Sequence, residues 1–231
     1  MEIMPIAHIR NDFVTKFGVP RQSGLAPSLI SQVVFQPAYR IADALRGLED
    51  FSHLWLIWEF SEAKQAAWSP TVRPPRLGGN QRMGVFATRS PFRPNSLGLS
   101  CVKIEKICLS TPEGPVIWVS GADLMNGTPI YDMKPYLPYA DCRMDAVGGF
   151  TDAVERAALT VVCPEALMAR IPSDRRQAVQ EILAQDPRPS YQHDPERVYG
   201  MAFGSVDIRF RVNGSVLTVT DVIPAGGSSP K

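Results

Sequence analysis

Basic residues gather in the middle of the chain with no acidic residue among them. From Ala63 to Ile104 there is no Asp or Glu, although the net charge of the whole chain is only +1. The basic side chains of this stretch are Lys64, Arg73, Arg76, Arg82, Arg89, Arg93 and Lys103. Guanidinium groups bind phosphate in a bidentate geometry, and repeated Pro and Gly favour a rigid, turn-rich backbone. The segment Arg73–Gly98 is therefore our candidate site for a polyanion or a nucleotide.

Within this segment, Arg89 and Arg93 stand four residues apart among prolines. Proline removes backbone freedom, so ordering the loop on a ligand costs less entropy. Phe92, between the two arginines, has an aromatic face on which a base could stack. The alternative is a structural loop in which Phe92 plugs one end of a barrel and the arginines are merely solvated. The sequence leaves both interpretations open.

Arginine outnumbers lysine 18 to 6 in the whole chain. A planar guanidinium stacks on bases and binds phosphate through two bonds, so this bias favours a nucleic-acid partner. The alternative is a GC-rich genome, which would replace Lys by Arg everywhere. That alternative does not explain why acidic residues are missing from Ala63 to Ile104.

Other candidate motifs carry less information. Asp123 and Asn126 follow an expected strand, but Asp and Asn near turns more often cap the backbone than catalyse. There is no Walker motif and no GxSxG. The three His residues are far apart and the four Cys form no CxxC pair, so we expect no metal site and reduced, mostly buried cysteines.

The pattern along the first 150 residues predicts short strands bounded by Gly, Pro or Asn. The expected strands are Ile3–Ile9, Ser31–Phe35, His53–Phe60, Leu97–Leu109, Pro115–Ser120 and Thr128–Met133. One short helix is expected from Pro37 to Gly47. Strands do not alternate with long helices and no GxGxxG follows a strand, which argues against a Rossmann sheet. We predict a mainly antiparallel β-barrel.

The composition changes near Asp145–Phe150, and the remaining chain has mixed patterning. We expect a strand at Ala157–Val162 and helices at Pro164–Arg170 and Ser173–Ala184, with Ser173 as a cap. Alternating apolar residues on both sides of Asn213-Gly214 predict a hairpin with a type I′ turn. The tail Pro224–Lys231 is expected to fray. The predicted division is a barrel domain at 1–148 and a smaller α+β domain at 149–231.

The overall composition is that of a soluble globular protein. Apolar residues make up 45% and charged residues 20% of the chain. No run approaches the roughly 20 apolar residues needed to cross a bilayer, and the N-terminus lacks a secretory signal. We expect a cytoplasmic protein without a membrane partner.

Five stretches, in this order, resemble the TsaA-like family, whose characterised members are tRNA methyltransferases of the TrmO type. They are FGVPRQSGL (Phe17–Leu25), DALRGLEDFSHLW (Asp43–Trp55), TVRPPRLGGNQRMGVFATRSPFRPNSLG (Thr71–Gly98), DLMNGTPIYDMKPYLPYAD (Asp123–Asp141) and DPRPSY (Asp186–Tyr191). The resemblance covers the expected barrel nearly end to end and reaches the C-terminal part.

The resemblance implies a single-sheet β-barrel that binds S-adenosylmethionine outside the Rossmann type, usually as a homodimer. It also implies methylation of N6 of threonylcarbamoyladenosine beside the anticodon of a threonine tRNA. By matching position, the cofactor-binding residues would be Pro20, Arg21, Gln22, Ser61, Glu62, Arg89, Leu97, Asp123, Leu124, Met125 and Asn126. The chain departs from some relatives, which have His-Gln at positions 61 and 62 and Asp at position 126.

If the resemblance holds, the target nitrogen is of urea type and a poor nucleophile, so a base that removes its proton would help. Asp123 is the carboxylate that we nominate, and the competing interpretation is that it only binds the cofactor. The expected RNA contacts are Arg73, Arg76, Arg82, Arg93 and Arg188 with phosphates, and Phe92 or Tyr191 with bases. The alternatives are a non-catalytic RNA-binding or nucleotide-binding module, and a barrel that methylates another small substrate.

Overall fold

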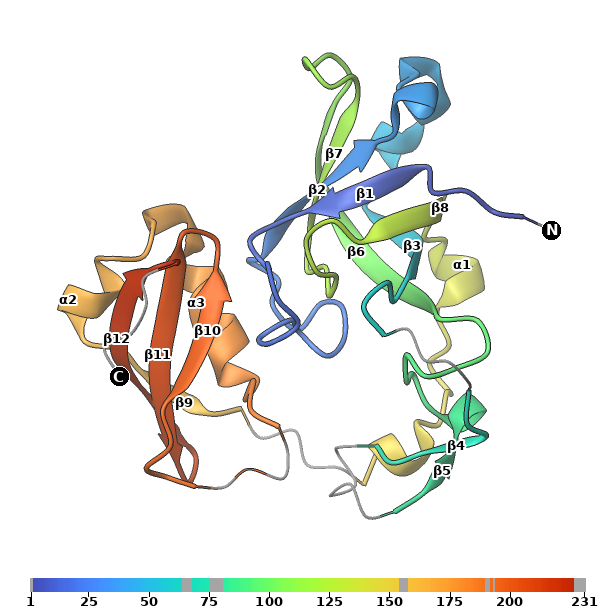
Figure 1. The fold of residues 1–231 in the computed structure, drawn as a ribbon. Helices are drawn as coiled ribbons and strands as arrows, with labels where there is room; N and C mark the ends of the chain where they lie inside the picture. The colour runs from blue at the N-terminus through green and yellow to red at the C-terminus, as the bar shows by residue number, and fades with distance from the viewer. Residues whose placement is uncertain are drawn as a thin grey trace.

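The computed structural model describes residues 2–63, 68–74, 81–153, 158–189, 192 and 194–226 of the chain. Its larger part is a β-barrel and its smaller part is a four-stranded sheet with helices on one face (Figure 1). The prediction of a mainly β fold, with an antiparallel barrel followed by a smaller α+β part, is confirmed.

The barrel closes in the strand order β1-β2-β7-β6-β3-β8, and all of its strand pairs are antiparallel. Its strands are β1 (Ala7–Arg10), β2 (Ile30–Phe35), β3 (His53–Glu59), β6 (Leu97–Cys108), β7 (Val116–Ser120) and β8 (Pro129–Pro135). In β3 every second side chain is buried, because alternate residues of a strand point to opposite faces. Leu54, Leu56 and Trp58 therefore fill the barrel together with Val102, Ile117 and Ile130.

The prediction of one short helix from Pro37 to Gly47 is wrong. The chain instead forms two 3₁₀ helices, Pro37–Tyr39 and Ala42–Leu45. Ile41, between them, has φ −113° and ψ 112°, an extended conformation that interrupts any continuous helix. Apolar residues at helical spacing therefore did not distinguish one helix from two tight turns.

The segment between β3 and β6 leaves the barrel wall. It contains the two-residue strands β4 (Thr71–Val72) and β5 (Met83–Gly84), which pair with each other, and a 3₁₀ helix, Val85–Ala87. Figure 1 shows this excursion below the barrel. Arg76 of the cationic segment lies outside the described residues.

The C-terminal sheet has the order β10-β11-β12-β9, with β9 parallel to β12. Its elements are β9 (Thr160–Val162), α2 (Glu165–Met168), α3 (Arg176–Ala184), β10 (Tyr199–Phe203), β11 (Val206–Asn213) and β12 (Val216–Pro224). The four buried residues of α3, namely Ala178, Val179, Ile182 and Leu183, pack in one cluster with Ile208 and Phe210 of β11.

The hairpin between β11 and β12 is confirmed, but its turn differs from the expected one. Asn213 pairs with Val216, so the two central residues of the turn are Gly214 and Ser215. Gly214 has φ 56° and Ser215 does not have a positive φ. This pattern corresponds to a type II′ turn, because type I′ needs a positive φ at both central residues. Ser173 does not cap its helix through its side chain either, since the preceding Pro172 occupies the cap position.

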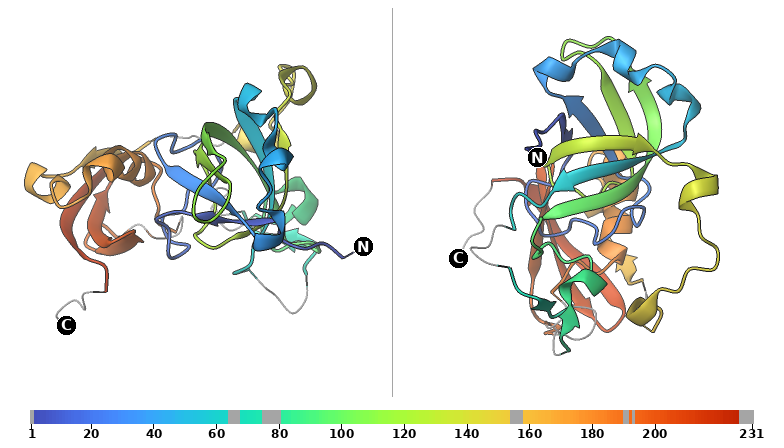
Figure 2. Two further views of the ribbon diagram at one scale, coloured as in Figure 1. Left: turned by 90° about the horizontal axis from the view of Figure 1, so that it is seen from above. Right: turned by 90° about the vertical axis from the view of Figure 1, so that its right-hand side faces the viewer.

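A long loop after β1, residues 11–29, joins the barrel to the C-terminal part. It lies between them in the left view of Figure 2. Phe13 is fully buried in the C-terminal core, and Asp12 Oδ2 accepts a 2.7 Å bond from Nε of Arg175. Gly18 has φ 91°, and a Cβ atom there would lie 2.4 Å from the sulfur of Met201. Only glycine allows this loop to approach β10 so closely.

No helix in the described part of the chain is long and apolar enough to cross a membrane. The four cysteines are free thiols. None of them is buried, in contrast to expectation: Cys101, Cys108 and Cys163 are half-buried and Cys142 is exposed.

Candidate cofactor and RNA site

Asp123 is a half-buried carboxylate in the loop between β7 and β8. Its Oδ1 accepts a 2.5 Å hydrogen bond from the hydroxyl of Ser100, and its carboxylate also accepts from its own backbone N–H and from that of Ser23. Burial raises the pKa of Asp123 above its ordinary value, although these hydrogen bonds and the charge of Arg89 act in the opposite direction. A carboxylate with a raised pKa is a stronger base than an ordinary surface carboxylate.

The pairing of β3 with β6 positions Ser100. Trp58 lies opposite Gly98 in this pairing, and its Nε1 donates a 2.9 Å hydrogen bond to the Ser100 hydroxyl. A Cβ atom at Gly98 would lie 2.3 Å from the indole ring, so the glycine leaves the space that the ring fills. Ser100 is only 1% exposed, and its hydroxyl accepts the bond from Trp58 and donates the bond to Asp123.

Arg89 and Gln22 form the neighbouring polar pair. Nη1 of Arg89 donates a 2.5 Å bond to Oε1 of Gln22, and Nε2 of Gln22 donates to the carbonyl of Arg21. Three stretches that are far apart in sequence therefore meet here: the 20–22 motif, the cationic segment and the loop that carries Asp123. The structure brings these predicted site residues together around one carboxylate and one guanidinium.

The residues that follow Asp123 have structural contacts of their own. Leu124 is fully buried in the barrel core, whereas Met125 packs against the C-terminal core. Oδ1 of Asn126 accepts a 3.1 Å bond from the backbone of Asn11, and its own N–H donates to Phe13. These contacts fix the start of the 11–29 loop, and cofactor contacts at the three positions stay predictions.

Ser61, Glu62 and Leu97 lie where β3 ends and β6 begins. The carbonyl of Glu62 accepts a hydrogen bond from the ammonium of Lys16, which ties the 11–29 loop to this end of the barrel. Ser61 is half-buried, and Leu97, opposite Glu59 in the β3–β6 pairing, is 38% exposed. Their predicted roles at the cofactor site stay predictions.

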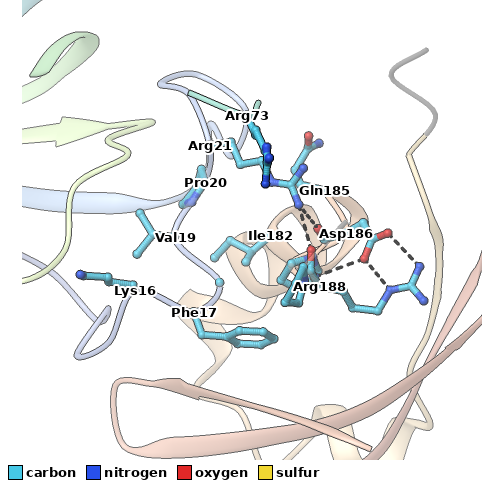
Figure 3. Close-up of a pocket in the computed structure, with 13 residues that line it drawn as sticks. Lys16, Phe17, Val19, Pro20, Arg21, Arg73, Ile182, Gln185, Asp186 and Arg188 are labelled. Atoms are coloured by element: carbon cyan, nitrogen blue, oxygen red, sulfur yellow. Dashed lines mark hydrogen bonds and ion pairs between the residues drawn. The ribbon is translucent and has the colours of Figure 1, made fainter. Parts of the chain in front are cut away.

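A cavity of about 610 Å³ opens between the 11–29 loop and the C-terminal part (Figure 3). Residues 16–21 and Arg73 line it from the barrel side, and Ile182 with residues 185–189 line it from the other side. The lining thus includes Pro20 and Arg21, which were predicted to bind the cofactor, and Arg73 and Arg188, which were predicted to bind RNA.

Arg21 bridges the two sides of this cavity. Its Nη2 donates to the backbone carbonyl of Arg188 at 2.9 Å and to that of Asp186 at 3.4 Å (Figure 3). Asp186 has φ 51°, and both of its carboxylate oxygens accept bonds from the Arg188 guanidinium, at 2.8 and 2.9 Å. Burial alone would raise the pKa of Asp186, but the hydrogen bonds and charge of Arg188 hold it below its ordinary value.

The predicted RNA contacts differ in how freely they are presented. Arg188 is only 8% exposed and is bonded to Asp186, so in this conformation it holds its own loop together. Arg93 donates to the carbonyl of Thr88 at 3.0 Å, and Arg82 to the hydroxyl of Thr71 at 3.3 Å. Phe92 is 40% exposed. Arg76 and Tyr191 lie outside the described residues.

Sequence reasoning missed several residues of this site, among them Lys16, Phe17, Ser23, Trp58 and Ser100. Trp58 and Ser100 belong to expected strands, where a buried polar group is a usable signal, but their partners depend on the strand register. Lys16 and Phe17 acquire their role only when the loop meets residues more than 160 positions later in the chain.

The fold and site define a two-domain protein in which a closed β-barrel and an α+β domain share a polar site and a cavity. Residues 8–142 match the family model of the tRNA-methyltransferase O N-terminal domain, and residues 156–225 match the model of the TrmO C-terminal domain. The chain therefore belongs to the tRNA-methyltransferase O family. The resemblance found in the sequence motifs is confirmed.

Individual relatives agree with this assignment. The chain is 47% identical over 178 residues to a tRNA (adenine(37)-N6)-methyltransferase of Eikenella corrodens, covering 77% of this chain and 99% of the relative. It is 39% identical over 233 residues to a putative S-adenosylmethionine-dependent methyltransferase of Pseudomonas aeruginosa, covering 97% and 98%. The crystal structure of TrmO from Pseudomonas aeruginosa superposes with a TM-score of 0.77 at 33% identity, covering 96% of this chain and 98% of that one.

Proposed function

We propose that this protein is an S-adenosylmethionine-dependent tRNA methyltransferase that methylates N6 of threonylcarbamoyladenosine at position 37 of threonine tRNA. The names of the two relatives support the adenine target and the cofactor. The observation that carries the proposal in this chain is the half-buried Asp123, whose pKa is raised by burial and which lies beside Arg89 and Gln22. The modification already on the adenosine and the choice of tRNA rest on the family resemblance.

The donor set fits S-adenosylmethionine. Asp123 supplies an anion for the amino group, the ribose or the sulfonium charge, and Arg89 supplies a cation for the carboxylate. The proposed cofactor residues are Pro20, Arg21, Gln22, Ser61, Glu62, Arg89, Leu97, Asp123, Leu124, Met125 and Asn126. Since Leu124 is buried in the barrel, its contribution is a backbone one.

When bound, the cofactor supplies a methyl group on a sulfonium sulfur that is open to displacement by a nucleophile in line with the breaking bond. The protein contributes position and a proton acceptor. Asp123 accepts the proton of the urea-type nitrogen during attack, while Ser100 fixes the direction of its carboxylate. The half-buried setting keeps part of the water away from that carboxylate and strengthens its electrostatic interactions.

For the RNA, we propose that Arg73, Arg76, Arg82, Arg93 and Arg188 contact phosphates and that Phe92 or Tyr191 stacks on a base. Arg73 is the best placed of the described set, because it is exposed and lines the cavity between the two parts. Arg188 would have to leave Asp186 to reach a phosphate.

We further propose that the protein works in the cytoplasm as a homodimer, with domains at 1–148 and 149–231. Three large apolar side chains after β8 support an interface between copies. Tyr139 is 84%, Met144 is 93% and Val147 is 87% exposed. Large apolar side chains left exposed near one another in sequence are candidates for a protein–protein contact.

Mass spectrometry of tRNA nucleosides tests the function. Purified protein with S-adenosylmethionine should convert threonylcarbamoyladenosine in threonine tRNA to its N6-methyl form, and tRNAs without that modification should remain unchanged. Methylation of unmodified adenosine, or no methylation of any tRNA, would reject the proposed substrate. Calorimetric titration with S-adenosylmethionine separates the enzyme from a simple RNA-binding module, which has no need for Arg21-dependent cofactor binding.

A further inference from the structure

The cavity between residues 16–21 and residues 182–189 has the size of a small-molecule site. At about 610 Å³ it falls within the roughly 300–1,000 Å³ usual for ligand pockets. Its walls come from both domains, and the Arg21 contact with the carbonyls of Asp186 and Arg188 crosses between them. A ligand in this cavity would therefore touch the barrel loop and the C-terminal domain at once.

The walls of the cavity are mostly apolar. Among the described residues that line it, Phe17 is the aromatic one, and the other large apolar side chains are Val19, Pro20, Ile182, Pro187 and Pro189. The Phe17 ring packs nearly parallel to two further rings, at 5° to Tyr199 and 23° to Phe210, with centroid distances of 6.5 and 6.3 Å. An aromatic ring packed among further aromatic rings provides a stacking platform for a planar heterocycle.

The rim of the cavity is cationic. Lys16, Arg21 and Arg73 line it, although the Lys16 ammonium is bonded to the carbonyl of Glu62. Among the described lining residues the carboxylate is that of Asp186, which is bonded to Arg188. Gln185 adds a side-chain amide, which offers the donor and the acceptor that the edge of a base requires. An apolar platform, an amide and a cationic rim together suit a base with its attached phosphate.

The cavity also adjoins the carboxylate proposed for proton transfer. Pro20 and Arg21 line it, and the next two residues are Gln22, bonded to Arg89, and Ser23, whose N–H donates to Asp123. One short loop therefore borders the cavity and contacts the methyl-transfer site.

We propose that this interdomain cavity binds one unstacked nucleotide of the RNA loop, with its base on Phe17 and its phosphate at Arg73. The inference rests on the proposed function and deepens it. It assigns the 11–29 loop and the 182–189 segment a joint role in recognising the substrate. Single-stranded loops are the part of RNA whose bases are free to be taken out of the stack in this way.

The experiment uses stem-loop RNAs that carry fluorescent 2-aminopurine at position 37 or at either neighbouring nucleotide, titrated into the full-length protein without cofactor. The variants are Phe17→Leu, which keeps an apolar side chain but removes the aromatic face, and Arg73→Ala. The matched control is Arg46→Ala, which removes an exposed arginine that pairs with Asp43.

With wild-type protein, at least one probe should lose fluorescence as it stacks. Phe17→Leu should abolish that change and weaken RNA binding about fivefold to tenfold. Arg73→Ala should weaken binding and lower the salt slope by about one, and Arg46→Ala should match wild type. A thermal melt checks that Phe17→Leu is folded. If Phe17→Leu is not folded, the inference is tested with Arg73→Ala only.

Two results would overturn the inference. In the first, neither the change in probe fluorescence nor the RNA affinity differs from wild type in Phe17→Leu and in Arg73→Ala. In the second, both variants lose S-adenosylmethionine affinity in calorimetry and bind RNA as wild type does, which would make the cavity a cofactor site. In either case, if wild-type protein still methylates tRNA, the proposed function stands and only this inference fails.

Discussion

The hydroxyl of Ser100 donates a hydrogen bond to Oδ1 of Asp123 from inside the barrel wall. Because the same hydroxyl accepts a bond from Nε1 of Trp58, its hydrogen has one direction in which to point. This bond stabilises the charged carboxylate and lowers its pKa, whereas burial raises it. The base strength of Asp123 is thus a balance that a residue with no access to substrate helps to set.

Replacing Ser100 by Ala should raise the pKa of Asp123 further, since the bond to the charged form is lost. Single-turnover methyl transfer measured against pH should then require a higher pH to reach its plateau. At pH values below that plateau we expect a rate loss of roughly tenfold, as for a hydrogen bond to a charged group worth about 1.5–3 kcal/mol. The plateau rate itself should change little.

Ser120→Ala is the matched control for this experiment. Ser120 is also a buried barrel serine whose hydroxyl donates to a carboxylate, that of Glu105, at 2.7 Å. This variant should leave the pH profile of methyl transfer unshifted. Equal shifts in both variants would mean that the effect comes from the barrel as a whole.

Asp123→Asn separates the two roles considered for this carboxylate. As a general base, its loss should slow single-turnover transfer by about 10²–10⁴-fold at saturating cofactor, with cofactor affinity retained. Weaker cofactor binding with an unchanged transfer rate would remove the proton-acceptor role. Calorimetry and rapid-quench kinetics on the same preparation give the two quantities.

The same variant has a pH signature in stability. Because the folded-state pKa of Asp123 is raised, the folded protein binds this proton more tightly than the unfolded chain, and stability falls as pH rises through that interval. Asn carries no such cost. The stability of Asp123→Asn relative to wild type, measured by urea denaturation, should therefore increase from acidic to neutral pH. A constant difference would show that the buried charge is not responsible.

Gly98→Ala tests the support behind Ser100. The added methyl group would lie 2.3 Å from the Trp58 ring, in a packed barrel that has no room to absorb it. We expect a loss of about 1–3 kcal/mol of unfolding free energy, together with slower methyl transfer as the indole moves away from Ser100. Gly84→Ala, where nothing lies within 4 Å of the added Cβ, should be near neutral. Comparable losses in both would point to backbone effects.

The barrel could largely be read from the sequence because its strands are short, strongly patterned and bounded by turn residues. The strands β2, β3, β6 and β7 begin and end within about one residue of the expected limits. The sequence pattern gave the wrong local structure at two places where it depends on the backbone dihedral angles of one residue. The extended conformation of Ile41 divides the expected helix into two 3₁₀ helices, and the turn at Gly214 is of type II′ where type I′ was expected.

The sequence motifs predicted which segments form the candidate site, but the contacts between those segments could be identified only in the three-dimensional structure. The cationic segment and the Asp123 loop were both found in the sequence, yet the link from Trp58 through Ser100 to Asp123 depends on strand register and barrel closure. Phe13 packs into the C-terminal core, although the sequence placed it in the barrel domain. Contacts across such distances leave no periodic signal along the chain.

Asp186→Asn tests whether the ion pair with Arg188 holds the C-terminal side of the cavity. The folded-state pKa of Asp186 lies below its ordinary value, so the pair contributes stability above the unfolded pKa of about 3.9 and loses it as pH falls further. Asn tolerates the positive φ of this position, which leaves the charge as the main change. The variant should be less stable than wild type at pH 7, and the difference measured by urea denaturation should shrink below about pH 4.

The control is Asp43→Asn. The Asp43 carboxylate forms an exposed pair with Arg46, and its removal should change the free energy of unfolding by less than about 0.5 kcal/mol. If the deficit of Asp186→Asn stays the same down to pH 3, the pair does not hold this loop through its charge.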